Sequence, residues 1–211
     1  MNESEESVFG MPDPLVSIII LNHNGREYLE RCLKSVRKQN GLQFEIIVVD
    51  NASSDGSGAY VRQHFPDIHL IESDRNLGFA GGANLGVREA KGVYVVLLNN
   101  DTEVEENWLR ELVAPLARDK VALVSSRVFT RGIDPKYYEK NGTLSLLGFN
   151  IMRVFDDEED LFNVSGCAMA FRRTDFPKPF DEDYFSYSED AYLSLRARFL
   201  GLRLKQAPRS I

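Results

Sequence analysis

The chain has 211 residues, 43% of them hydrophobic and 27% charged, which is enough to bury the core of one soluble domain. Its formal net charge of −7 argues against general nucleic-acid binding, because phosphate recognition needs a basic surface. No apolar run is long enough to span a membrane, and the two cysteines, Cys32 and Cys167, are too few for a disulfide framework.

The first 13 residues are acidic and polar, and they lack the basic and apolar regions of a secretion signal. We expect them to form a disordered leader, and we expect a cytoplasmic protein. An apolar run at residues 16–21 predicts a buried strand, which ends on the polar cluster Asn22, His23, Asn24 and Gly25. A helix is predicted over residues 26–39, because one face collects Leu29, Cys32, Leu33 and Val36.

Two further strands follow the same plan, each leading into polar residues. Residues 44–49 form a predicted strand that stops on Asp50, and a short helix over 58–64 and a weaker strand over 68–72 come next. A glycine-rich segment, residues 76–82, enters a helix with a small apolar face of Ala80, Ala83, Val87 and Ala90. Residues 93–98 are continuously apolar, which is typical of a strand buried on both faces, and they stop on Asn99, Asn100 and Asp101.

This alternation predicts the α/β class, with a mostly parallel, twisted sheet flanked by helices. The second half of the chain predicts a helix over 108–116 and strands over 121–128 and 164–171, the last broken by Gly166. Residues 131–161 are the least regular part of the sequence. A final helix follows Asp190, with an apolar face made of Tyr192, Leu195, Phe199 and Leu202.

Three polar strand ends predict a ligand cleft, because the carboxyl ends of parallel strands meet at one edge of the sheet. Asp101 among the amides of Asn99 and Asn100 suits a hard divalent cation such as Mg²⁺, although a polar turn would have the same composition. Gly78, Gly81 and Gly82 could let backbone N–H groups approach a phosphate, or they could simply permit tight helix packing.

Taken together, these stretches resemble the nucleotide-sugar glycosyltransferases of family 2, which have the GT-A fold. The matching stretches are residues 16–24, 48–57, 76–86, 97–104 and 180–201, in the family's order. Among the members of this family, the resemblance is closest to the rhamnosyltransferase-like ones, which act on cell-envelope polysaccharides. The resemblance covers residues 14–211 as a single GT-A domain, with a nucleotide-binding half at 14–104 and an acceptor-binding half at 105–211.

The resemblance implies inverting transfer of a sugar from a UDP- or dTDP-sugar to a hydroxyl of a glycan or lipid-linked acceptor, so attachment at the inner face of a membrane stays open. Asp50 would contact the base, Asp101 would bind Mg²⁺ or Mn²⁺, and Asp190, beside Glu189, would be the catalytic base. Asp190 also begins the last helix, whose dipole favours an ionised carboxylate. The implied donor-binding residues are Leu21, Asn22, Asn24, Asp50, Ser53, Asn76, Gly78, Gly81, Asn84, Asn99 and Asn100.

Two departures from the family pattern keep an alternative open. Asn99 stands where the family's metal motif usually begins with an acidic residue. The family also commonly has a histidine beyond the final helix, whereas this chain has only His23, His64 and His69, so we expect a truncated or incomplete catalytic unit. A non-catalytic nucleotide-sugar binding domain is therefore the main alternative. A phosphoreceiver module is disfavoured by the length of the chain, and a nucleotidyltransferase by the lack of a basic, glycine-rich first loop.

Overall fold

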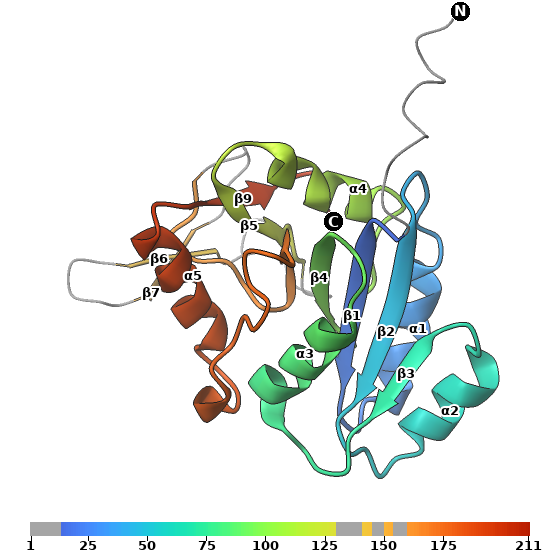
Figure 1. The fold of residues 1–211 in the computed structure, drawn as a ribbon. Coiled ribbons are helices and arrows are strands. Elements are labelled where there is room, and N and C mark those ends of the chain that lie inside the picture. Colours follow the sequence, from blue (N-terminus) through green and yellow to red (C-terminus); the bar gives the residue numbers. More distant parts are fainter. Residues whose placement is uncertain (1–13, 130–140, 145–149, 154–159) are drawn as a thin grey trace, which may run out of the picture.

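A computed structural model describes residues 14–129, 141–144, 150–153 and 160–211 (Figure 1). The leader predicted for the first 13 residues lies outside the described residues. The first half contains β1 (Val16–Asn22), α1 (Arg26–Val36), β2 (Phe44–Asp50), α2 (Ser57–His64), β3 (His69–Glu72), α3 (Gly78–Glu89) and β4 (Tyr94–Asn99). The second half contains α4 (Trp108–Val113), β5 (Val121–Ser126), β6 (Asn141–Leu144), β7 (Asn150–Arg153), β8 (Ala168–Arg172), α5 (Glu189–Phe199) and β9 (Arg203–Ala207).

Seven strands form the main sheet in the order β3-β2-β1-β4-β8-β5-β9. The pairs β1–β2, β1–β4, β2–β3 and β5–β9 are parallel, and β8 runs antiparallel to both of its neighbours. This confirms the predicted α/β class with a mostly parallel sheet. The chain moves outward from β1 through β2 to β3 and then returns to place β4 on the other side of β1, so the strand order reverses between β1 and β4.

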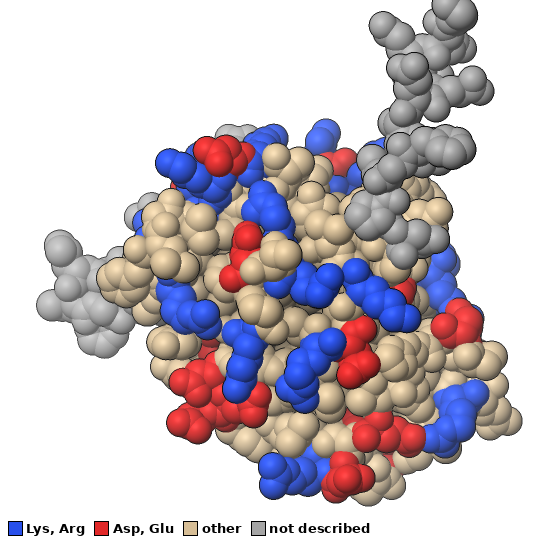
Figure 2. Space-filling view, viewed as in Figure 1, with Lys and Arg blue, Asp and Glu red and all other residues tan. Residues whose placement is uncertain are grey.

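Two hydrophobic cores cover the two faces of the sheet. On one face, alternate residues of β1 such as Ile18 and Ile20 belong to a core that also contains buried side chains of α1, α2 and α4. On the other face, Ile19 belongs to a core that contains buried side chains of α3 and α5, the helices on that side of the sheet in Figure 1. The predicted faces of α1 and α3 are confirmed, because Leu29, Cys32, Leu33, Val36, Ala80, Ala83, Val87 and Ala90 are all buried. Figure 2 shows basic and acidic side chains interspersed over the face that carries α3 and α5.

Several predicted boundaries were wrong. The strand predicted over 164–171 begins only at Ala168, because the N–H of Gly166 is used by the carboxylate of Asp190 and not by a neighbouring strand. The helix predicted over 108–116 ends at Val113 and continues as a 3-10 turn, Ala114–Ala117, which contains Pro115. The helix predicted over 26–39 ends at Val36, and the strand predicted over 121–128 ends at Ser126.

The predicted buried face of the last helix was also wrong. In α5 the buried residues are Glu189, Leu193, Ser194 and Ala197, whereas Tyr192 and Phe199 are exposed. The hydroxyl of Ser194 accepts a hydrogen bond from the N–H of Val164, which fixes this face against the segment leading to β8. Apolar residues surround this helix on more than one side, so their spacing alone did not identify the face that the sheet covers. No helix within the described part of the chain is long and apolar enough to cross a membrane.

Candidate active site

The sheet register brings the three polar strand ends together. Asn22 lies opposite Asp50 in the β1–β2 pair, and Leu21 lies opposite Asn99 in the β1–β4 pair. These are the carboxyl ends of the three parallel strands that flank the reversal in strand order. Open α/β sheets bind ligands at this place, because the connections on either side turn away from each other and leave a crevice.

Asn22 forms the centre of the first strand end, and its side chain is fully buried. Its amide nitrogen donates to the hydroxyl of Ser53 over 3.1 Å and to Oδ1 of Asp50 over 3.5 Å. The same serine hydroxyl accepts from the N–H of Asn24 over 2.9 Å, and Oδ1 of Asn24 accepts from the N–H of Ser54. The ends of β1 and β2 are thus connected by side-chain hydrogen bonds as well as by strand pairing.

Asp50 is buried, with 6% of its surface exposed. Its Oδ1 accepts from the N–H of Ser53 over 3.3 Å in addition to the Asn22 amide. A Cβ atom added to Gly58 would lie 2.7 Å from Oδ2 of Asp50 and 2.6 Å from Oε1 of Glu72, so only a glycine allows the backbone to approach these carboxylates so closely. Oδ1 of Asp50 therefore accepts hydrogen bonds from the protein, and Oδ2 lies beside the backbone of Gly58.

Asn51 is a structural organiser that the sequence analysis did not single out. Its amide donates to Oδ1 of Asn76 and to the carbonyl of Gly78, and its own Oδ1 accepts from the N–H of Leu77. These three bonds fasten the glycine-rich segment to the end of β2. Gly78 has φ +70°, and a Cβ there would lie 2.2 Å from the carbonyl oxygen of Phe185, so no other residue fits without displacing that backbone.

The remaining predicted residues of this segment lie within α3. A Cβ atom on Gly81 would lie 2.9 Å from the side chain of Leu77, which explains why the residue at this position has no side chain. Asn84 is buried, and its amide nitrogen donates to the carbonyl of Phe180 and to Glu182, while its oxygen accepts from the N–H of Phe180. Asn84 thus fastens α3 to the segment that precedes α5, and its donor-binding role stays a prediction.

At the third strand end, Asp101 is exposed and makes no hydrogen bond or ion pair within the described residues. Its charge acts on two nearby thiols: burial raises the pKa of Cys32 and of Cys167 to about 12 each, and the Asp101 carboxylate adds to both shifts. Within the described residues no three His, Cys, Asp or Glu side chains group together as metal ligands. One free carboxylate with neighbouring amides fits a divalent cation only if the donor diphosphate supplies further oxygens.

Asp190 is brought close to this strand end by a short link. Oδ2 of Asp190 accepts from the N–H of Gly166 over 2.9 Å, and the carbonyl of the next residue, Cys167, accepts from the N–H of Asn99 over 2.9 Å. The start of α5 and the end of β4 are thus joined through two consecutive residues. The N-terminal end of α5 also favours negative charge on Asp190.

Glu189 differs from its neighbour because it is buried, with 6% of its surface exposed. One carboxylate oxygen, Oε2, is buried without a hydrogen-bond partner. Burial raises the pKa of Glu189 above its usual value, and the charge of Asp190 acts in the same direction. The preceding residues Tyr187 and Ser188 both have positive φ, so this turn is held in a conformation that side chains rarely adopt.

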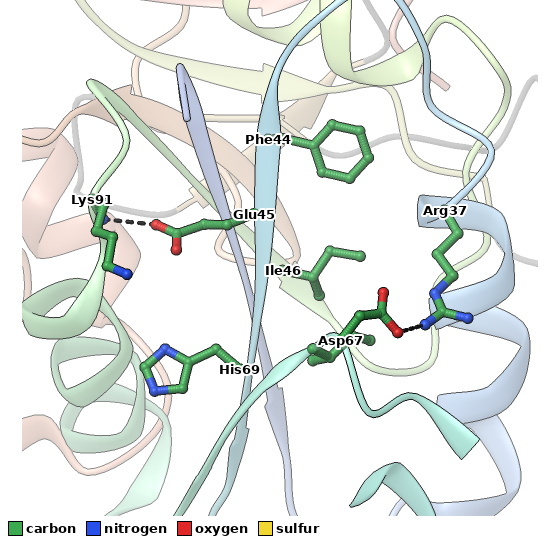
Figure 3. Close-up of a pocket in the computed structure, with 8 residues that line it drawn as sticks. Arg37, Phe44, Glu45, Ile46, Asp67, His69 and Lys91 are labelled. Carbon is green, nitrogen blue, oxygen red and sulfur yellow. Dashed lines mark hydrogen bonds and ion pairs between the residues drawn. The ribbon is translucent and has the colours of Figure 1, made fainter. Parts of the chain in front are cut away.

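A separate pocket of about 560 Å³ lies where β2 and β3 begin, at the opposite edge of the sheet (Figure 3). Its charged groups are largely paired: Glu45 accepts from the hydroxyl of Ser17 and from the N–H of Lys91, and Arg37 forms an ion pair with Asp67. None of the catalytic, donor-binding or metal-binding residues predicted from the sequence lines this pocket. The candidate site is therefore the carboxyl edge and not this pocket.

Comparisons with known proteins agree with this architecture. The family model described as Glycosyl transferase family 2 matches residues 17–178. The chain is 29% identical over 120 residues to the glycosyltransferase AglE of Haloferax volcanii, covering 54% of this chain and 40% of that protein. It is 31% identical over 121 residues to the succinoglycan biosynthesis protein ExoO of Rhizobium meliloti, covering 53% of this chain and 34% of that protein.

The chain thus spans about two fifths or less of the length of these two relatives. Its fold is similar to the crystal structure of GalNAc-T7 with UDP, GalNAc and Mn²⁺, with a TM-score of 0.76 and 20% identity over 92% of this chain and 42% of that one. This likeness establishes the GT-A type of fold. The chain belongs to glycosyl transferase family 2.

Proposed function

We propose that the chain is an inverting glycosyltransferase domain that transfers a sugar from a UDP- or dTDP-sugar to a hydroxyl of a glycan or lipid-linked acceptor. Residues 14–104 would bind the nucleotide, and residues 105–211 would contribute the acceptor side. One observation carries the proposal. The N–H of Gly166 donates to Asp190, and the N–H of Asn99 donates to the carbonyl of Cys167, so the Asp190 carboxylate lies next to the strand end that carries Asp101.

At the donor end, Asp50 would accept a hydrogen bond from the imide N–H of uracil or thymine. Its Oδ1 is occupied by Ser53 and Asn22, which leaves Oδ2 for this contact. Leu21, Asn24, Gly78 and Gly81 would complete the walls around the nucleoside and the diphosphate. The bonds that Asn51 makes to residues 76–78 support this role, because they hold the glycine-rich backbone against the same strand end.

Asp101 would hold Mg²⁺ or Mn²⁺ together with the diphosphate, and the adjacent residues Asn99 and Asn100 would contribute to donor binding. When bound, such a cation neutralises the negative charge that grows on the leaving diphosphate. The free carboxylate of Asp101 supports this assignment, and so does the presence of UDP and Mn²⁺ in the GalNAc-T7 structure of similar fold.

Asp190 would remove the proton of the acceptor hydroxyl as that hydroxyl attacks the anomeric carbon opposite the diphosphate. Inversion requires a base on this side, since a neutral hydroxyl is a poor nucleophile. Glu189 would support Asp190 from the buried side of the turn. Its unpartnered oxygen and its raised pKa mark it as a group whose charge is disfavoured by its surroundings.

The proposal is tested by incubating the chain with a panel of UDP-, dTDP- and GDP-sugars, dTDP-rhamnose included, and with a glycan acceptor that carries free hydroxyl groups, with and without Mn²⁺. We expect release of nucleoside diphosphate from a uridine or thymidine donor only when Mn²⁺ or Mg²⁺ is present. Proton NMR of the transferred sugar should then report the anomeric configuration opposite to that of the donor. Nucleotide binding without any release or transfer would instead favour the alternative of a non-catalytic nucleotide-sugar binding domain.

A further inference from the structure

Four side chains at the ends of β1, β2 and β4 form one continuous hydrogen-bonded chain. The amide nitrogen of Asn100 donates to Oδ1 of Asn22 over 2.6 Å. The amide nitrogen of Asn22 donates onward to Ser53 over 3.1 Å and to Asp50 over 3.5 Å. Asn22 is fully buried and Asp50 nearly so, which means that water cannot readily replace these bonds.

The direction of this chain follows from Asp50. A carboxylate oxygen only accepts hydrogen bonds, as Oδ1 of Asp50 does from the N–H of Ser53, so Asn22 must present its nitrogen to Asp50. The amide oxygen of Asn22 then has to face Asn100, and the amide nitrogen of Asn100 donates a hydrogen bond to it. As a result, the amide oxygen of Asn100 is left free of this chain.

The backbone at Gly25 shows how closely these groups are packed. A Cβ atom added there would lie 2.0 Å from the amide nitrogen of Asn100 and 2.8 Å from the oxygen of Asn22. The two amides therefore pass directly over a residue that has no side chain. The close contact at Gly25 restricts both amides, which reinforces the orientation that Asp50 imposes on them.

We propose that Asn22 is a positioning residue that fixes Asp50 and Asn100 together, so that Oδ2 of Asp50 faces the base of the donor and the amide oxygen of Asn100 faces the diphosphate end. This inference rests on the proposed donor site. It differs from a direct donor contact by Asn22, because every polar atom of the Asn22 side chain is already bonded to the protein. The orientation itself is a property of the free protein.

The orientation is tested without any ligand by a double-mutant cycle on thermal unfolding. Asn100→Asp places a carboxylate against the oxygen of Asn22, which cannot turn because its nitrogen serves Asp50, so we expect a clear loss of stability. In the Asn22→Ala background that oxygen is gone, and Asn100→Asp should cost much less. Asn100→Ala, measured in both backgrounds, controls for loss of the amide alone. If Asn100→Asp is harmless or stabilising in the parent, the orientation is reversed and the proposal fails.

The functional part is tested by the affinities for UDP and CDP in the presence of Mn²⁺. Cytosine has an acceptor where uracil has its imide N–H, so a correctly placed Asp50 discriminates between them. We expect Asn22→Ala to lower the ratio of UDP to CDP affinity by about 2- to 10-fold, the value of one neutral hydrogen bond, and to raise the Mn²⁺ concentration needed for half-maximal binding.

Ser53→Ala provides the matched comparison, because it keeps the bond between Asn22 and Asn100. Ser53→Ala should leave the Mn²⁺ concentration for half-maximal binding near that of the parent, while it lowers the ratio of UDP to CDP affinity. A purely structural role of Asn22 would lower the unfolding temperature and leave both the UDP to CDP ratio and the Mn²⁺ requirement unchanged, which would overturn the proposal. If the parent binds neither nucleotide, the proposed function fails, and the unfolding cycle still decides the orientation.

Discussion

Replacing Asp190 by asparagine separates catalysis from binding, and its effect on stability follows from the two bonds that the carboxylate makes. Oδ2 accepts from the N–H of Gly166 over 2.9 Å, and Oδ1 accepts from the N–H of Ala191 over 2.7 Å. An asparagine has a single acceptor oxygen, so one of these N–H groups would face an NH₂ group. An unsatisfied group of this kind costs about 1–3 kcal/mol, and loss of charge at the helix start adds about 0.3–1 kcal/mol.

The unfolding temperature of Asp190→Asn should therefore fall by roughly 2–4 °C for each kcal/mol lost, as is usual for chains of this size. Turnover should fall by about 10²- to 10⁴-fold, because a general base is worth that much, whereas the affinity for the nucleotide donor should stay close to that of the parent. Both quantities are measured on one preparation, by the release of nucleoside diphosphate and by titration calorimetry, at a temperature where the variant is folded.

Asp183→Asn is the matched control, since Asp183 is an exposed carboxylate in the segment that precedes α5. It should keep the turnover of the parent. An Asp190→Asn variant with full turnover would move the base to another residue. A variant that loses donor binding instead would place Asp190 at the donor end and contradict the role derived above.

Three further outcomes follow from the site. Asp50→Ala should weaken UDP and dTDP binding by roughly 1.5–3 kcal/mol, the value of a charge-assisted hydrogen bond, and unchanged calorimetric affinity would exclude base recognition by Asp50. Asp101→Ala should abolish the gain in UDP affinity that Mn²⁺ provides, and a retained gain would place the cation elsewhere. Glu189 has a raised folded-state pKa, so its contribution to stability is full below the unfolded value and is lost as pH rises through the folded value. Denaturant unfolding from about pH 4 to about pH 8 should therefore show Glu189→Gln gaining stability over the parent as pH rises, and parallel curves would refute this.

The parallel half of the sheet could be predicted from the sequence because each of its inner strands is a continuous apolar run that stops on polar residues. The runs before Asn22, Asp50 and Asn99 mark three strands whose carboxyl ends the sheet brings to one edge. Position in the chain was therefore enough to locate the candidate site, since strands of one parallel sheet end on the same side.

What the sequence could not predict depends on contacts between distant residues. The bond between Asn22 and Asn100 joins residues 78 positions apart, and neither residue carries a local signal for the other. Asn51 lies in a polar stretch that has the composition of an ordinary turn, and only its three hydrogen bonds to residues 76–78 identify its role. The buried face of α5 was misassigned for the same reason, because the neighbour that covers a helix is a property of the fold and not of its own spacing.

Paramagnetic broadening by Mn²⁺ in the presence of UDP tests the location of the donor site most directly. The amide resonances of a ¹⁵N-labelled chain would be recorded with UDP and increasing Mn²⁺. Our account predicts that the signals of Asn22, Asn99 and Asp101 broaden first and that those of His69 and Lys91, in the pocket at the opposite edge of the sheet, persist. Broadening that begins at His69 and Lys91, with the carboxyl edge unaffected, would contradict the account.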